Sequence, residues 1–479
     1  MLILEPWGLS LFLICIPFAW VAHWNVESWG HEAQFVSALV VGNSVCFLSI
    51  MSLQNIFESC GDQLALRVGK DLSELICISF RNCVEATLAF ILLRRCHLRL
   101  LQSTIIGVVV LHLLLVQGTA FFIGGSQIVK QHLSKHHVSI NPSLLMIGVL
   151  SVVIPTAFFV ALDRGDNAMV IASPPAPLVG DRVRDWILKT SHAVAIMLLI
   201  VYVISRVHRH LWSLSPQARA KLPQWLKCFL PTASESSVAD EEHAPKREQT
   251  KDADLVPRGV CAFIIIVSIV VMSVTAEFLV DSIDPVRERY NIQAEFFGLI
   301  LLPLVSFLPE GMVALFKFLS KFPRYALLNV LPERLRPAWS SFYAKCCKTK
   351  AFNFMSKLQI EMPPEPDARG TPIDSSIQFL LWWMPFVILV GWWIGKPIHL
   401  LFDYFEVALL LGTCFLVNHV TADGETNFAE GFTMITFYAM VATAAWFYPG
   451  QSQVGYMLSC PESVAAAVAS GVQNALVLH

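Results

Sequence analysis

The sequence has few charged residues for its length. Asp, Glu, Lys and Arg make up 15% of its 479 residues, against about 25% in ordinary soluble domains. Apolar residues make up 55%, and they gather in blocks of about 20 with few charges inside them. A soluble chain of this length would divide into domains with polar surfaces. The shortage of charge therefore predicts a membrane protein.

Several function classes lack their usual signals. The 34 basic and 36 acidic residues nearly cancel, leaving a net charge of -2, so no overall field would attract nucleic acid. The sequence contains no nucleophile-base arrangement, P-loop or dinucleotide fingerprint. We therefore expect a transporter with no cofactor, rather than an enzyme. The 12 cysteines stand mostly alone inside apolar blocks, so we expect neither a disulfide nor a zinc framework.

The apolar blocks do not alternate polar and apolar residues as barrel strands do, so they are predicted to be helices. The expected fold is an all-α membrane protein with about eleven transmembrane helices. The predicted spans cover residues 8–23, 33–54, 74–93, 100–123, 142–162, 186–206, 258–283, 294–319, 376–398, 401–420 and 428–447.

The loops indicate an orientation. If the spans alternate in direction, loops on the amino-terminal side carry 20 Lys and Arg, and the opposite loops carry 10. Basic residues favour the cytosolic side. We therefore expect a cytosolic amino terminus and, because the number of spans is odd, a lumenal carboxy terminus. The first apolar run has no basic leader and is expected to be a retained helix.

The chain divides into five parts. One of them, the segment 208–257, has a polar composition that cannot support a packed core and is read as a linker. The parts are an amino-terminal helix (1–32), a first five-helix repeat (33–207), a cytosolic linker (208–257), a second five-helix repeat (258–450) with a long basic loop (321–372), and a carboxy-terminal tail (451–479).

The two repeats carry acidic residues at matching places. Asp62 closes one span, and Glu85 lies inside the next. In the second half Glu277 closes a span and Glu310 lies inside the next one. Each repeat has an odd number of spans, so the two would insert in opposite directions, as in many secondary transporters.

Glu85 and Glu310 are the main functional candidates, because a charged residue inside a membrane span costs about 2.5–3.5 kcal/mol on insertion. Ca²⁺ takes hard oxygen ligands, and burial raises a carboxyl group's affinity for protons. A site of two such glutamates would hold either calcium or protons, which is the chemistry of antiport. Asn82, one turn before Glu85, could add an amide oxygen.

The start of the ninth predicted span offers further oxygen ligands in Ser375, Ser376 and Gln378. Taken without their neighbours, these are ordinary helix-start residues.

Several motifs resemble the fungal vacuolar calcium/proton exchangers of the cation/calcium antiporter superfamily. The resemblance covers about residues 10–320 and 372–450. The motifs are Leu64–Gly69, Asn82–Glu85, Ala276–Ile283, Phe297–Leu299, Leu302–Pro303, Ser375–Gln378, Gly395–Pro397, Leu400–Asp403 and Trp446–Pro449.

This resemblance implies eleven spans, two inverted five-span repeats and a place in the vacuolar membrane. It also implies export of cytosolic calcium into the vacuole in exchange for protons, with membrane lipid, calcium ions and protons as partners and no nucleic acid. Glu85 and Glu310 would carry the transported ion, and Glu277 matches a further functionally important acid.

Two departures from the family motifs fall at the expected site. Arg81 stands where the family has a glycine, one turn before Glu85, and Phe307 replaces an asparagine near Glu310. Arg81 could pair with Glu85 in place of the cation, or it could turn away towards an interface. The alternative to an active calcium exchanger is therefore a relative that is inactive or prefers a monovalent cation or manganese. The sequence does not indicate an oligomeric state.

Overall fold

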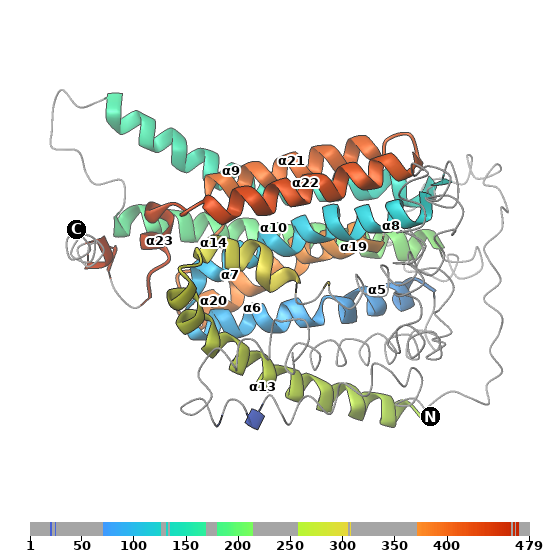
Figure 1. The fold of residues 1–479 in the computed structure, drawn as a ribbon, viewed down its shortest axis with the longest axis horizontal. Coiled ribbons are helices and arrows are strands. Elements are labelled where there is room, and N and C mark those ends of the chain that lie inside the picture. Colours follow the sequence, from blue (N-terminus) through green and yellow to red (C-terminus); the bar gives the residue numbers. More distant parts are fainter. Residues whose placement is uncertain are drawn as a thin grey trace, which may run out of the picture.

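The computed structural model shows a bundle of long helices that run roughly along one axis (Figure 1). It describes residues 20, 21, 24, 70–125, 131–132, 135–168, 180–213, 257–304, 307, 371–460, 463, 464 and 466–468. The first two predicted spans lie almost wholly outside these residues. So do most of the linker at 208–257 and of the loop at 321–372.

Within the described residues, six helices are long and apolar enough to cross a membrane, and a bent pair makes a seventh. A shorter apolar helix, α21 (Tyr404–Val420), corresponds to the predicted span at 401–420. The six are Leu98–Gly125, Pro142–Ala161, Asp181–His210, Gly259–Tyr290, Pro372–Trp393 and Phe428–Phe447.

The first half of the bundle contains three composite or long spans. The bent pair is α5 (Lys70–Arg81) with α6 (Cys83–Arg95). The next span joins α7 (Leu98–Val110), the π-helical turn η2 (Leu111–Val116) and α8 (Gln117–Gly125). The long helices α9 (Lys135–Ala168) and α10 (Asp181–Ser213) follow.

The second half begins with α13 (Arg258–Tyr290), α14 (Ala294–Phe296) and the π-helical turn η4 (Phe297–Leu301). It resumes with α19 (Thr371–Gln378), the π-helical turn η5 (Phe379–Trp383) and α20 (Met384–Trp393). The last described helices are α21, α22 (Phe428–Phe447) and α23 (Ser452–Met457).

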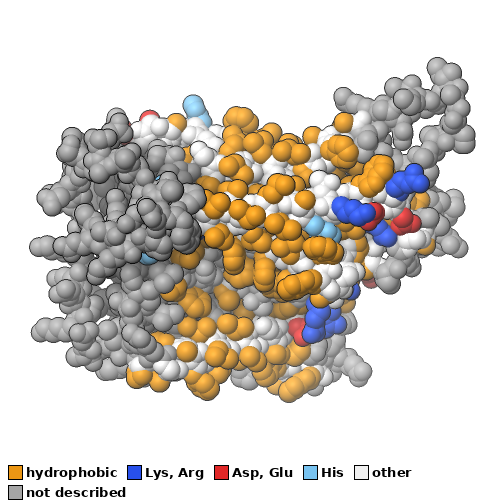
Figure 2. Space-filling view, turned by 180° about the vertical axis from the view of Figure 1, so that it is seen from behind, with side chains coloured by type: hydrophobic (Ala, Val, Ile, Leu, Met, Phe, Trp, Pro, Cys, Tyr) orange, Lys and Arg blue, Asp and Glu red, His pale blue; other side chains and the backbone are white. Residues whose placement is uncertain are grey.

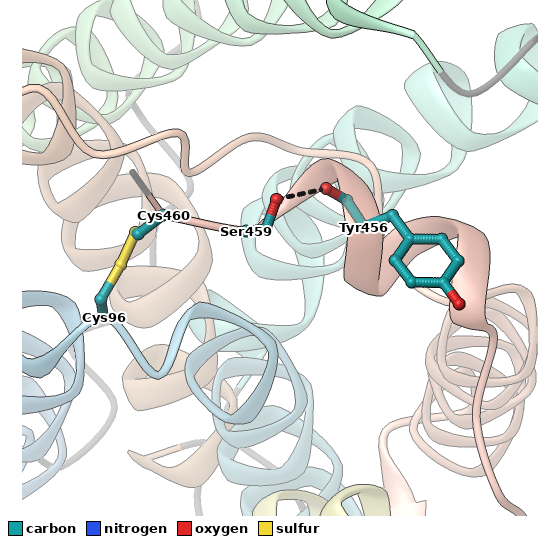
Figure 3. Close-up of a disulfide and its surroundings, with 4 residues drawn as sticks. All are labelled: Cys96, Tyr456, Ser459 and Cys460. Atoms are coloured by element: carbon teal, nitrogen blue, oxygen red, sulfur yellow. Dashed lines mark hydrogen bonds between the residues drawn. A yellow bond between two sulfur atoms is a disulfide. The ribbon is translucent and has the colours of Figure 1, made fainter. Parts of the chain in front are cut away.

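The two ends of the bundle are tied in different ways. At one end β1 (Gln131–His132) pairs antiparallel with β2 (Glu425–Thr426). At the other end Cys96, after α6, forms a disulfide with Cys460, after α23, with a Cα–Cα distance of 6.5 Å (Figure 3). The expectation of no disulfide was therefore wrong. The two cysteines are 364 residues apart, so neither their spacing nor their surroundings in the sequence indicated the pair.

The described residues 452–460, in the segment expected to be a tail, pack against the bundle. Met457 in α23 is fully buried, and the disulfide fixes Cys460 to the loop after α6. Beyond it the amide of Val464 donates a hydrogen bond to the Asp181 carboxylate at the start of α10. The carboxy-terminal segment thus covers the end of the bundle where α6 ends and α10 begins.

A buried loop joins α20 to α21 at this same end. Gln102 in α7 donates hydrogen bonds to the backbone oxygens of His399 (2.7 Å) and Leu401 (3.1 Å). The amide of Leu400 donates to the Ser191 hydroxyl in α10 at 2.9 Å. These side chains satisfy backbone groups that have no helical partner, which allows the loop to lie between the helices.

Apolar side chains cover the middle of the bundle, and charged side chains gather towards one end (Figure 2). Of the most apolar 18 residues in each of α10, α13 and α22, only 28% are buried, whereas in the spans that contain α7 and α19 72% are buried. Helices α10, α13 and α22 therefore present an apolar surface suited to lipid, and the spans that contain α7 and α19 form the centre of the bundle.

Candidate functional site

The bent pair α5–α6 places the predicted amide and carboxylate at one point inside the bundle. The two helices meet at an angle of 50°, and Asn82 lies between them with φ -83° and ψ 6°. Glu85 occupies the first turn of α6, where the positive end of the helix dipole favours a carboxylate. Its exposed fraction is 2%. The break therefore converts one apolar span into a helix start that carries a buried acid.

A chain of hydrogen bonds joins this break to α19. The Asn82 amide nitrogen donates to the Ser375 backbone oxygen (3.2 Å) and to Gln378 Oε1 (2.8 Å). Gln378 Nε2 in turn donates to the Ser79 hydroxyl at 2.8 Å, and Ser79 donates to the Leu75 backbone oxygen. Residues almost 300 positions apart thus form one buried network.

The network fixes which way the Asn82 amide points. A backbone carbonyl can only accept a hydrogen bond, so the Asn82 atom facing Ser375 must be nitrogen. The amide oxygen, Oδ1, therefore points elsewhere. Asn82 Oδ1 and the Ser375 hydroxyl oxygen are both buried and have no hydrogen-bond partner within the described part of the chain. The helix break that carries Glu85 thus has two buried neutral oxygens whose hydrogen-bonding capacity is unused among the described residues.

Charged and aromatic groups surround this network. Arg81 ends α5 next to Asn82, and its charge acts on His112, which is buried on η2. From α10, the Tyr202 hydroxyl is buried and has no hydrogen-bond partner within the described residues. Asp374 of α19, 1% exposed, lies 3.8 Å from Arg209 of α10. The site therefore contains positive charge on two sides.

The structure brings together some of the predicted residues. Asn82, Ser375 and Gln378 share the network, and Glu85 lies one turn from Asn82. Ser376 is fully buried, but its hydroxyl donates back to the Pro372 oxygen of its own helix at 2.9 Å.

Glu277 lies elsewhere. Its carboxylate pairs with Arg94 and Arg95 at the far end of α6, about 13 Å along the helix from Glu85. Phe307 is 9% exposed within the apolar core. Asp62 and Glu310 fall outside the described residues, so the place of the second glutamate stays a prediction.

Sequence reasoning missed Ser79, which anchors Gln378. Ser79 precedes Asn82 by three residues, which is about one helical turn. This spacing was the signal that could have identified Ser79 as part of the site. Among the described residues, no group of three or more His, Cys, Asp and Glu side chains could hold a metal ion. Any cation bound here would depend on amide, hydroxyl and carbonyl oxygens beside Glu85.

Comparisons with known proteins show which proteins the chain resembles. The family model of the sodium/calcium exchanger protein matches residues 260–331. A vacuolar calcium ion transporter of Cryptococcus neoformans is 26% identical over 95% of this chain and 76% of its own length. The chain is thus similar to members of the cation/calcium antiporter superfamily. A Schizosaccharomyces pombe vacuolar calcium ion transporter is 25% identical over 92% of this chain and 85% of its own length.

Further proteins are similar along nearly the whole chain. A Ca²⁺/H⁺ antiporter of Synechocystis is 25% identical over 92% of this chain and 97% of its own length. The solved structure of native YfkE has a TM-score of 0.57 at 17% identity, covering 91% of this chain and all of that one. The H⁺/Ca²⁺ exchanger CAX has a TM-score of 0.50 at 10% identity, covering 92% of both chains. These structures share the helical fold of this chain.

Proposed function

We propose that the protein is a calcium/proton antiporter that moves cytosolic calcium into the vacuole in exchange for protons. Relatives named as vacuolar calcium ion transporters and Ca²⁺/H⁺ antiporters match 92% or more of the chain. The observation that carries the proposal is the Asn82–Gln378 network, which leaves two buried oxygens unpartnered beside Glu85. Hard neutral oxygens next to a buried carboxylate are ligands suited to Ca²⁺.

Coupling to protons follows from the burial of the carboxylates. An empty site with ionised glutamates inside a bundle is costly, so it takes up protons, whereas calcium requires both carboxylates in their charged form. If only the proton-loaded or calcium-loaded protein can change its access from one side to the other, the two ions move in opposite directions. Glu310 is proposed as the second carboxylate.

The disulfide supports the proposed orientation. Disulfides persist in oxidising compartments and are rare where thiols are kept reduced. The end that carries Cys96 and Cys460 is therefore assigned to the lumen, and the end that carries the β1–β2 pair to the cytosol. This assignment agrees with the lumenal carboxy terminus expected from the basic residues, and it implies a cytosolic amino terminus.

The π-helical turns support the proposed inverted repeats. In the expected layout of eleven spans, the span with η2 in the first repeat corresponds to the span with η5 in the second. A π-helical turn is rare and occurs often at functional sites. Its recurrence at corresponding spans is what two copies of one five-helix unit would show.

One feature favours a second candidate function. Arg81 lies beside the break that holds Asn82 and Glu85, and a guanidinium at such a place can neutralise a carboxylate in the way a bound cation does. The alternative is thus a member with altered selectivity, for a monovalent cation or manganese, or with no transport. In that case Arg81→Gly together with Phe307→Asn should create calcium transport that the unmodified chain lacks.

The proposal is tested in vesicles that contain the purified full chain. We expect calcium uptake that requires an imposed proton gradient, stops when an ionophore collapses the gradient, and is lost in Glu85→Gln. Uptake that persists without the gradient would contradict antiport. Competition by manganese, sodium and potassium in the same vesicles separates calcium selectivity from the alternative.

A further inference from the structure

A second group of buried carboxyls lies at the disulfide end of the bundle. We define the lumenal carboxyl cluster as Glu295 of α14, Asp403 before α21 and Glu406 in the first turn of α21, together with Arg99 of α7. The three carboxyl side chains have exposed fractions of 2%, 6% and 1%. The cluster therefore holds more acids than bases in a largely dry place.

Two of the three carboxyls have close polar partners. Glu295 forms an ion pair with Arg99. The Asp403 carboxylate accepts hydrogen bonds from the Tyr448 hydroxyl (2.6 Å) and from the backbone amides of Phe405 (2.9 Å) and Gln451 (2.8 Å). Burial and the Asp403 carboxylate raise the pKa of Tyr448, so Tyr448 remains a neutral donor.

Glu406 differs from these two. The Ser103 hydroxyl lies near its carboxyl group, and the Glu406 Oε1 atom is buried with no hydrogen-bond partner among the described residues. The charges that act on it are Asp403 and Glu295, which repel a second negative charge, and Arg99, which is already paired with Glu295. A buried carboxylate facing two others is costly unless it carries a proton.

The elements packed against α21 offer no other charge to Glu406. They are α7, α9, η2 and α22. The described side chains of α9, residues 142–161, include no titratable group. The titratable groups on the remaining elements, apart from those of the cluster, are His112 on η2, Tyr438 on α22 and the neutral donor Tyr448 after it, together with Glu430 in the first turn of α22, at the opposite end of that helix.

We propose that Glu406 is a proton-binding site at the lumenal end of the transporter, separate from the Asn82–Gln378 network. Glu406 takes one proton from lumenal water and returns it there or passes it inward. Asp403 and Glu295 hold the proton by repelling a bare carboxylate. The role in exchange rests on the proposed antiport function, whereas the presence of the proton does not.

The backbone is shaped around this cluster. Gly450 has φ +75°, and a Cβ there would collide with Arg99 and Glu295. The Arg99 guanidinium also donates to the Pro449 oxygen at 3.4 Å. The segment after α22 therefore closes over the ion pair and limits access of water to Glu406 from that side.

The first test is infrared spectroscopy of the purified full chain in lipid nanodiscs. We expect protonated carboxyl absorption near neutral pH that shifts in deuterated water, and Glu406→Gln should remove one component of it. Glu85 and Glu310, the proposed proton carriers of the exchange site, account for any component that remains. Glu288→Gln is the matched control, because Glu288 is an exposed acid at the same end. It should leave the absorption unchanged. Absorption that is also unchanged in Glu406→Gln would overturn the proposal.

The second test measures calcium uptake against lumenal pH in vesicles. We expect Glu406→Gln to lose the dependence on lumenal pH that the unmodified chain and Glu288→Gln retain, and Glu406→Asp to restore part of it. An unchanged pH profile in Glu406→Gln would refute a role in exchange. If the unmodified chain shows no uptake, the antiport proposal fails, and the infrared absorption still decides whether Glu406 holds a proton.

Discussion

Replacing Gln378 by leucine tests whether the hydrogen-bond network orients a calcium ligand. The side chain makes two hydrogen bonds at 2.8 Å, one from Asn82 and one to Ser79. Hydrogen bonds inside membrane proteins contribute about 0.6 kcal/mol each on average. The loss of both bonds therefore destabilises the observed orientation of the Asn82 amide by about 1.2 kcal/mol. If calcium binding must restore that orientation, Gln378→Leu should raise the KM for calcium about eightfold.

The assay is initial-rate uptake of radioactive calcium into proteoliposomes under a fixed proton gradient. Ser376→Ala is the matched control, because that hydroxyl is buried on the same helix but bonds only to the Pro372 oxygen of its own helix. We expect its KM to stay within about twofold of the unmodified value. An unchanged KM in Gln378→Leu, or an equal rise in Ser376→Ala, would refute the reasoning.

Three further predictions concern the scaffold. With Cys96→Ala, Cys460 should become reactive to a membrane-impermeant maleimide applied from the lumenal side, whereas in the unmodified chain it should react only after reduction. Burial lowers the pKa of His399 to about 4, below its usual 6.5. The stability that this neutral histidine contributes is therefore present above pH 6.5 and is lost as the pH falls towards 4, by up to about 3 kcal/mol. His399→Gln should flatten the fall of the melting temperature over that range, as followed by tryptophan fluorescence. Gly431→Ala, whose Cβ would collide with the backbone of α8, should lower the melting temperature, whereas Gly412→Ala, with its nearest atom 3.9 Å away, should not.

Hydropathy located the helices in the described residues because a span in lipid needs a long apolar run. The prediction for 428–447 matches α22 at both ends. The predicted span at 74–93 missed the bend at Asn82, because both sides of the bend are apolar and the hydropathy does not change there. The π-helical turns leave no local signal for the same reason.

The candidate site was predicted only in part. Asn82, Glu85 and Gln378 were singled out because they are polar residues inside predicted spans. The hydrogen bond between Asn82 and Gln378, however, joins residues 296 positions apart. No periodicity reports such a contact. The lumenal carboxyl cluster was missed because Asp403 and Glu406 lie at a predicted helix start, where acids are common. Their burial becomes visible only once α7, α14 and the segment after α22 pack around them.

The central claim is that a buried carboxylate at the bend binds calcium and protons in turn. The most direct measurement is proton-gradient-driven calcium uptake by the purified chain, compared between the unmodified protein and Glu85→Gln in vesicles of the same protein content. We predict uptake that the gradient drives in the unmodified protein and that is lost in the variant. Equal uptake by the two, or uptake that ignores the gradient, would contradict the account.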